Sequence, residues 1–100
     1  MHGNKDQFKT EYLPRVAQED IPKLDKHLRE IIQRKIEKLQ EEPYLGFPLR
    51  GRLSGCYKLK ISKYRVIYKI LHDRLIILVI AIGKRDDLIA YKLALRRLFP

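Results

Sequence analysis

A β-hairpin is predicted by residues 55–68, whose sequence is GCYKLKISKYRVIY. Apolar and basic residues alternate along both halves, and a period of two places alternate side chains on opposite faces of a strand. A two-residue loop at 62–63 would fix the register, because a shift by one residue turns every side chain to the other face. The facing pairs are then Ile61–Tyr64, Lys60–Arg65 and Leu59–Val66. We expect the rest of the chain to be organised around this hairpin.

Cations gather on one face of the predicted hairpin. The register places Lys58, Lys60 and Arg65 together, and like charges that face each other destabilise a sheet by a few tenths to about 1 kcal/mol per pair. A chain that keeps such a cluster is expected to use it to bind an anion. The alternative interpretation is a solvated strand face without a ligand. The apolar face carries three tyrosines that are expected in the core: Tyr57, Tyr64 and Tyr68.

The composition predicts one globular domain over residues 1–100, with residues 1–6 as a flexible tail. A chain of 100 residues with 45% hydrophobic residues can bury a core without a metal or a disulfide. Its single cysteine, Cys56, is expected to be a small apolar residue and is typical of a reducing cytoplasm. The polar N-terminus predicts no secretory signal. The longest apolar run, residues 75–82, is far shorter than the roughly 20 residues that span a bilayer, so no membrane partner is expected.

The excess of positive over negative charge is confined to the half of the chain that contains the hairpin. Residues 1–49 carry 9 Lys or Arg and 9 Asp or Glu, whereas residues 50–100 carry 13 and 3, which accounts for the whole net charge of +10. Such a distribution indicates a nucleic-acid partner, because Lys and Arg displace condensed counterions from phosphates. The alternative is that these charges only keep the protein in solution.

The N-terminal half predicts a strand and two helices. The strand is expected over residues 8–13, and a short first helix, interrupted by Pro22, ends near Leu24. Asp25 is the expected N-cap of a second helix, which Pro43 terminates. That helix carries an apolar stripe at helical spacing: Leu28, Ile31, Ile32, Ile36 and Leu39.

A loop, a turn, a strand and a last helix account for the remaining residues. Glycine and proline predict a loop over residues 43–55, and a turn follows the hairpin at 71–74. Residues 75–82 are apolar without alternation, which indicates a central strand that is covered on both faces. Asp86 is the expected N-cap of the last helix. One side of that helix would carry Leu88, Tyr91, Leu95, Leu98 and Phe99.

These elements predict an α+β fold with a small antiparallel sheet. Their order is strand, two helices, a three-strand meander and a C-terminal helix. Consecutive strands joined by short turns pair in an antiparallel manner, and the helices are expected to cover one face of the sheet.

Four segments of the sequence and a tyrosine in the last helix resemble the RelE family of toxins from type II toxin–antitoxin systems. The resemblance extends from about Phe8 to Leu98. Its segments are Leu49-Arg50-Gly51, Cys56-Tyr57-Lys58-Leu59-Lys60, Tyr64-Arg65-Val66-Ile67-Tyr68 and Ile82-Gly83-Lys84-Arg85, with Tyr91 in the last helix. The joint presence of the two strand lysines, the Tyr-Arg, the Gly-Lys-Arg and a tyrosine in the last helix resembles the RNA-cleaving branch of the RelE/ParE superfamily.

The resemblance implies a fold like that of microbial ribonucleases and cleavage of messenger RNA in the ribosomal A site. It also implies two macromolecular partners, an acidic RelB-like antitoxin and the ribosome with its mRNA and rRNA, and no metal or other cofactor. By this resemblance the catalytic residues are Lys58, Lys60, Arg65, Arg85 and Tyr91. The cations expected to contact RNA around them are Arg50, Arg52, Lys63 and Lys84.

Cleavage by the adjacent 2′-hydroxyl needs a base, a charge clamp on the phosphorane and an acid for the 5′-oxygen. His2, His27 and His72 fall in a tail, on a helix surface and in a turn, so a histidine mechanism is disfavoured. A lysine among cations is deprotonated more readily, which favours Lys60 as the base, with Lys58 and Tyr91 as the alternatives.

The other matched residues have narrower expected roles. Lys58 and Arg65 would clamp the phosphate, and Arg85 would clamp it or assist the leaving oxygen. Tyr91 would stack on a base or transfer a proton, unless it is a core residue of the last helix. Two other functions stay open: a ParE-like toxin that inhibits gyrase, and a module that binds RNA without cleaving it.

Overall fold

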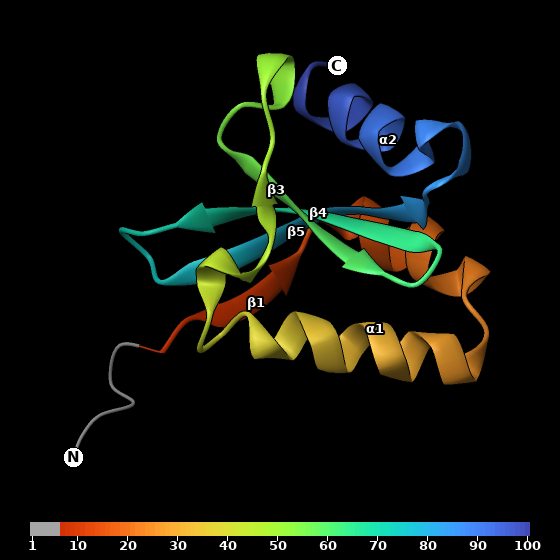
Figure 1. Cartoon of the computed structure of the whole chain (residues 1–100), viewed down its shortest axis with the longest axis horizontal. Helices are drawn as coiled ribbons and strands as arrows, with labels where there is room; N and C mark the ends of the chain where they lie inside the picture. Colours follow the sequence, from red (N-terminus) through yellow and green to blue (C-terminus); the bar gives the residue numbers. More distant parts are fainter. Residues whose placement is uncertain (1–6) are drawn as a thin grey trace.

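The structure is a computed structural model and describes residues 7–100, over which five strands form one sheet (Figure 1). Their order across the sheet is β1-β5-β4-β3-β2. The strands are β1 (Lys9–Tyr12), β2 (Phe47–Pro48), β3 (Cys56–Ile61), β4 (Tyr64–Leu71) and β5 (Ile76–Lys84). Strands β3, β4 and β5 form the predicted antiparallel meander, whereas β1 pairs with β5 in a parallel manner. The α+β class is confirmed, and the sheet is mixed because of β1.

The two helices, α1 (Lys26–Lys38) and α2 (Ile89–Leu98), cover opposite faces of the sheet (Figure 1). On the α1 face, Ile32 and Ile36 pack with Val66 in one core cluster. On the α2 face, a second cluster comprises Leu53, Cys56, Ile67, Ile80, Ala81, Ala90 and Ala94. The expectation that both helices cover one face is therefore wrong. Apolar residues on both faces of β4 and β5 require a helix on each side.

The hairpin has the predicted register, and its loop has two residues. Lys60 pairs with Arg65, Leu59 with Val66 and Ile61 with Tyr64. Ser62, the first loop residue, has a φ of 54°, which tight hairpin turns require at this position. The tyrosines of the apolar face lie in the α1-side core, where Tyr68 is fully buried, and Tyr57 and Tyr64 pack at its margin.

The N-terminal helical region is broken, as predicted. A π-helical turn over Val16–Asp20 is followed by a 3₁₀ turn over Ile21–Lys23, which contains Pro22. The Asp25 carboxylate accepts a hydrogen bond of 2.8 Å from the Leu28 N–H, so the predicted N-cap of α1 is confirmed. Helix α1 ends at Lys38, before Pro43, so this proline does not terminate it.

The segment predicted as a loop, 43–55, contains the short strand β2 and two 3₁₀ turns, Pro43–Leu45 and Gly51–Leu53. The Tyr68 hydroxyl holds β2 in place, because it accepts a bond of 3.0 Å from the Gly46 N–H and donates one of 2.7 Å to the Pro43 carbonyl. A Cβ atom at Gly46 would lie 2.6 Å from the Lys58 carbonyl oxygen. Only glycine therefore allows β2 to approach β3 this closely.

Replacing Tyr68 with phenylalanine is expected to lower the free energy of unfolding by about 1–3 kcal/mol, because the Gly46 N–H and the Pro43 carbonyl lose their common partner. Urea denaturation measures the loss. Burial raises the pKa of Tyr68 above its ordinary value of 10.0. Folding therefore favours the neutral hydroxyl. Its contribution to stability is fully present below pH 10 and is lost as the pH rises from that value through the raised pKa of the folded protein. The control is Tyr57→Phe, which changes the ring that stacks on Tyr68. An equal loss of stability in Tyr57→Phe would contradict the prediction.

The entry to α2 differs from the prediction. Residues Asp86–Leu88 form a 3₁₀ turn, so Asp86 is not the N-cap; Leu88 occupies that position without a side-chain bond. The side of α2 that packs on the sheet is centred on Ala90 and Ala94, whereas Leu88 and Phe99, expected on that side, are exposed. Small residues are needed there because the helix lies close to β5. A Cβ atom at Gly83 would lie 2.9 Å from the Ala90 nitrogen.

Backbone strain at Leu88 provides a prediction of stability. Leu88 has a φ of 53° and its side chain is exposed, so glycine removes a steric cost without removing buried surface. After the greater entropy of unfolded glycine is subtracted, Leu88→Gly is expected to stabilise the fold by about 0.5–1 kcal/mol. Thermal denaturation should show a melting temperature that is higher by about 2–8 °C. Leu88→Ala keeps the Cβ atom and should give no such gain; equal gains would exclude strain as the cause.

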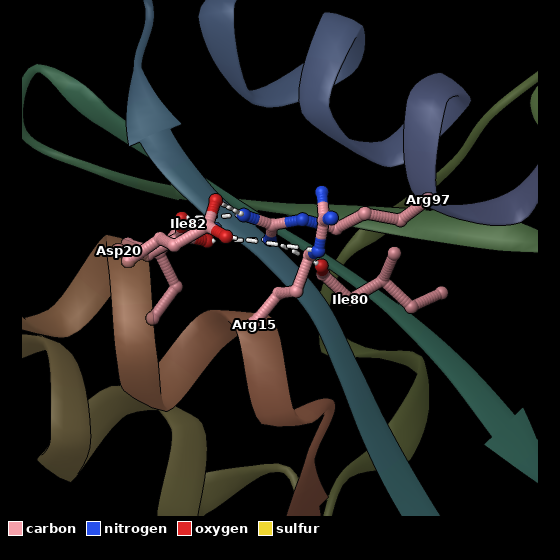
Figure 2. A network of polar contacts seen from close by, with 6 residues as sticks. Arg15, Asp20, Ile80, Ile82 and Arg97 are labelled. Carbon is pink, nitrogen blue, oxygen red and sulfur yellow. Dashed lines mark hydrogen bonds and ion pairs between the residues drawn. The ribbon is translucent and has the colours of Figure 1, made fainter. Parts of the chain in front are cut away.

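A buried ion pair joins three elements that are far apart in the sequence (Figure 2). The Asp20 carboxylate accepts two bonds of 2.8 Å from the Arg97 guanidinium and one of 2.8 Å from the Ile82 N–H. Arg97 also donates to the Ile80 carbonyl at 2.9 Å. The hydrogen bond from Asp20 and its charge raise the pKa of Arg97, against the opposing effect of burial. This network, which sequence patterns did not reveal, fixes the C-terminal end of α2 to β5 and the π-helical turn.

Candidate active site

Three of the predicted catalytic cations lie on the α2 face of the sheet. Lys60 on β3 pairs with Arg65 on β4, and Arg65 pairs with Gly83 on β5, so one row of residues crosses three strands. Lys58 lies two residues along β3 on the same face. Lys60 is exposed, Lys58 is half-buried and Arg65 is 9% exposed. The expectation that these cations project from the same face is confirmed.

Arg65 is fixed by the hairpin loop. Its Nη1 atom donates to the Tyr64 carbonyl at 2.8 Å and to the Ser62 carbonyl at 3.2 Å. A guanidinium has five N–H groups in a rigid plane, so one nitrogen can bond the backbone while the group still presents positive charge to an anion. The loop therefore orients the charge of Arg65.

Arg85 reaches the same end of the sheet through a backbone contact. Its N–H donates to the Lys63 carbonyl at 2.7 Å, which ties the end of β5 to the hairpin loop. The Arg85 side chain is 58% exposed, with Nε 3.8 Å from a carboxylate oxygen of Asp86. An exposed pair of this kind is weak and can be exchanged for a phosphate. Arg85 thus lies at the loop that also orients Arg65.

The predicted RNA-contacting residues are divided between the two faces. Lys84 pairs with Tyr64 and so lies on the α1 face, whereas Lys63 is exposed in the hairpin loop. Arg50 is exposed in the segment before β3. Arg52 is also exposed, and its guanidinium carbon lies 4.7 Å from the centre of the Phe99 ring at the end of α2. Of these four residues, Lys63 lies in the loop that joins Lys60 to Arg65, Arg50 and Arg52 lie in the segment before β3, and Lys84 lies on the face opposite the three cations.

Tyr91 lies in the first turn of α2, where it is half-buried against the α2-side core cluster. Tyr91 therefore packs on the core, as one interpretation of the sequence predicts, and its ring is also partly accessible, as the other requires. Helix α2 contacts β4 and β5, which places the N-terminal end of α2 and Gly83 next to each other. Tyr91 thus belongs to the element that borders the cationic row on its β5 side.

The histidines that the structure describes lie away from this row. His27 is exposed on α1, and His72 is exposed in the β4–β5 turn, where its Nε2 atom is 3.2 Å from the Tyr44 hydroxyl. That turn is at the opposite end of β5 from Arg85. His2 lies outside the described residues. Cys56 is buried, and burial raises the pKa of its thiol, so the expected role as an apolar residue is confirmed.

An aromatic residue that the sequence analysis did not single out contacts the site. The Lys60 ammonium lies 5.0 Å from the centre of the Phe47 ring. Phe47 is on β2, and a strand of two residues has no alternation that a sequence pattern can reveal.

Among the residues the structure describes, no three His, Cys, Asp or Glu side chains gather in a group that could hold a metal ion. Within the same range, no helix is long and apolar enough to cross a membrane.

The chain is similar to known toxins of type II toxin–antitoxin systems. The family model for the ParE toxin of type II toxin–antitoxin systems, parDE, matches residues 12–89. The mRNA interferase toxin RelE of Escherichia coli K12 is 33% identical over 79 residues, which cover 76% of this chain and 82% of RelE.

Solved structures match the fold. A mutant of the E. coli toxin RelE in the free state has a TM-score of 0.77 at 26% identity, over 92% of this chain and 98% of that one. The toxin chain of the intact E. coli RelBE toxin–antitoxin complex has a TM-score of 0.67 at 27% identity, over 80% and 98%. The chain therefore belongs to the RelE/ParE family of toxins from type II toxin–antitoxin systems.

Proposed function

We propose that this toxin is an endoribonuclease that cuts messenger RNA in the ribosomal A site and so inhibits translation. The observation that carries the proposal is the row Lys60–Arg65–Gly83, with Lys58 beside it and Arg85 tied to the loop that orients Arg65. Cations aimed at one place stabilise the extra negative charge of a phosphorane, which is the largest contribution in many such reactions. The name of the E. coli relative, an mRNA interferase, supports the same activity.

In the proposed reaction, the 2′-oxygen attacks the adjacent phosphorus and the bond to the 5′-oxygen breaks. Lys60 accepts the proton of the 2′-hydroxyl, and Lys58 and Arg65 hold the phosphate oxygens. Arg85 stabilises the departing 5′-oxygen, which takes up a proton from Tyr91 or water. The product strands end in a 2′,3′-cyclic phosphate and a 5′-hydroxyl. The base and the groups that hold the phosphate in this scheme come from the chain, so the reaction is proposed to need no metal.

Two partners follow from the proposal. The ribosome would present the mRNA in a strained conformation, and the many cations of residues 50–100 suit a surface of rRNA phosphates. An acidic antitoxin would bind the same basic protein and keep it from cleaving mRNA. A RelB-type antitoxin is the partner in the solved RelBE complex, and a protein of this type is the proposed partner here.

The test is primer extension on an mRNA that is being translated in a purified system. Added toxin is expected to produce stops within codons only when ribosomes are present, and prior addition of the cognate antitoxin should abolish them. Ribosomes that translate normally in the presence of excess toxin would exclude the proposed activity.

The name of the matching family model favours a second candidate, inhibition of DNA gyrase through a protein contact. A supercoiling assay with purified gyrase separates the two activities. Inhibition of supercoiling with intact mRNA would support the ParE-like function, whereas cut mRNA with normal supercoiling would support the nuclease.

A further inference from the structure

Phe47 is a large aromatic side chain left in solvent beside the cationic row. The residue is 55% exposed. Phe47 pairs with Lys58 across the β2–β3 ladder, so the two side chains project from the same face of the sheet. The Lys60 ammonium lies 5.0 Å from the centre of the ring. The proposed phosphate site is therefore bordered by an accessible ring on the side away from α2.

The backbone that carries Phe47 is held rigidly. On one side, the Gly46 N–H donates to the buried Tyr68 hydroxyl at 3.0 Å. On the other side, the Leu49 N–H donates to the Cys56 carbonyl at 2.9 Å. A mobile loop can turn an apolar ring away from water, but this fixed segment keeps the ring of Phe47 exposed. A preorganised ring binds a flat partner without a further entropy cost of ordering.

We propose that Phe47 is a stacking platform for a nucleobase of the RNA whose phosphate binds Lys58, Lys60 and Arg65. This inference rests on the proposed nuclease function and names a positioning residue for its substrate. An aromatic face beside clustered cations has the composition of sites that bind single-stranded nucleic acid, in which bases stack on rings and the backbone follows positive charge. Lys60 lies against the ring, so the base stacks on the part of Phe47 that Lys60 leaves open.

Phe47 and Tyr91 border the cationic row from opposite sides. Phe47 comes from β2, beyond β3, whereas Tyr91 comes from α2, which packs over β4 and β5. An RNA strand that crosses the row would meet one ring on each side of the bound phosphate. Stacking does not depend on hydrogen-bond groups of the base. We therefore expect Phe47 to favour purines over pyrimidines through ring area, without selecting one base.

The test measures cleavage of mRNA on programmed ribosomes, under single-turnover conditions and at varied ribosome concentration, by Phe47→Ala, Phe47→Leu and Phe47→Tyr. Phe47→Ala is expected to lower the efficiency of cleavage by about 5- to 100-fold, the range for loss of one stacked base. Tyrosine restores stacking and should restore activity, whereas leucine restores only apolar area and should not. Because Phe47 is exposed, all three variants should have the wild-type urea midpoint.

A second measurement identifies the stacked base. One abasic nucleotide is placed in turn at each position around the cut. At the stacked position, the abasic mRNA should slow wild-type protein by the same factor as Phe47→Ala and should slow the variant no further. The control variant is Tyr44→Ala, since Tyr44 is also exposed but packs on Tyr57 and His72; it should cut normally.

The outcomes separate this inference from the function on which it rests. Wild-type protein that cuts nothing overturns both. Wild-type cleavage that Phe47→Ala leaves unchanged overturns only the platform. Equal slowing of wild type and Phe47→Ala by every abasic position also overturns it and points to a role in holding Lys60. A loss of antitoxin affinity with normal cleavage would make Phe47 part of a protein interface instead.

Discussion

Replacing Arg85 with alanine is expected to lower cleavage of translated mRNA by about 100- to 1,000-fold, the usual effect of removing one preorganised group that stabilises transition-state charge. The side chain is 58% exposed and its charge contact, with Asp86 at 3.8 Å, is weak. The backbone N–H that ties Arg85 to the hairpin loop is kept in the variant. The loss should therefore lie in the chemical step, and the urea midpoint should be that of the wild type.

Arg74→Ala is the matched control for this experiment. Arg74 is also an exposed arginine, but it lies in the β4–β5 turn, at the opposite end of β5 from Arg85. Removing it lowers the net charge by the same amount and should lower cleavage by only a few-fold, through weaker attraction to the ribosome. Equal losses in the two variants would mean that Arg85 acts through overall charge and has no place in the active site.

The hairpin register could be predicted from sequence because two signals agree on it. Alternation of apolar and basic residues assigns each side chain to a face, and the two-residue loop fixes which residues face each other. The pair Lys60–Arg65 followed from these signals and is confirmed. The placement of Arg85 beside the loop depends on a backbone bond to Lys63. The family resemblance, but no local pattern, indicated that Arg85 belongs with the other cations.

Other features lack a local signal. Strand β2 has two residues, and Gly46 and the Tyr68 hydroxyl, which is far along the chain, hold it in place. The predicted side of α2 was right for Tyr91, Leu95 and Leu98, which pack against the α2-side core cluster, but it missed Ala90 and Ala94, which are fully buried where close approach to β5 excludes larger residues. Leucine spacing also placed Leu88 and Phe99 on this side, and both are exposed. Periodicity reports where apolar residues gather, but it does not report how near two elements come.

The sequence also does not predict the Asp20–Arg97 pair, because both residues are charged and charged residues are usually exposed.

Replacing Asp20 with alanine is expected to lower the free energy of unfolding by about 3–5 kcal/mol, since the buried Arg97 charge and the Ile82 N–H both lose their partner. A chain of this size has a total stability of about 5–15 kcal/mol. Urea denaturation should show a partly unfolded variant or one with a much lower midpoint.

Two further variants separate the buried pair from surface charge. Glu19 also approaches Arg97, at 3.5 Å, but its side chain is 46% exposed. Glu19→Gln should therefore cost at most about 1 kcal/mol. The double variant Asp20→Leu with Arg97→Met removes both charges and should recover part of the loss, because apolar residues can replace a buried ion pair. Recovery should be incomplete, since the Ile82 N–H and the Ile80 carbonyl remain without their partners.

The same pair is expected to affect catalysis only through the position of α2. Arg97 lies at the end of the helix whose first turn carries Tyr91, and Asp20 ties that helix to β5. At a temperature at which Asp20→Asn stays folded, the variant should keep its cationic row and lose cleavage only to the extent that Tyr91 is displaced. If its activity falls as far as that of Arg85→Ala while its near-ultraviolet circular dichroism is unchanged, Asp20 has a direct role in the reaction, which its burial argues against.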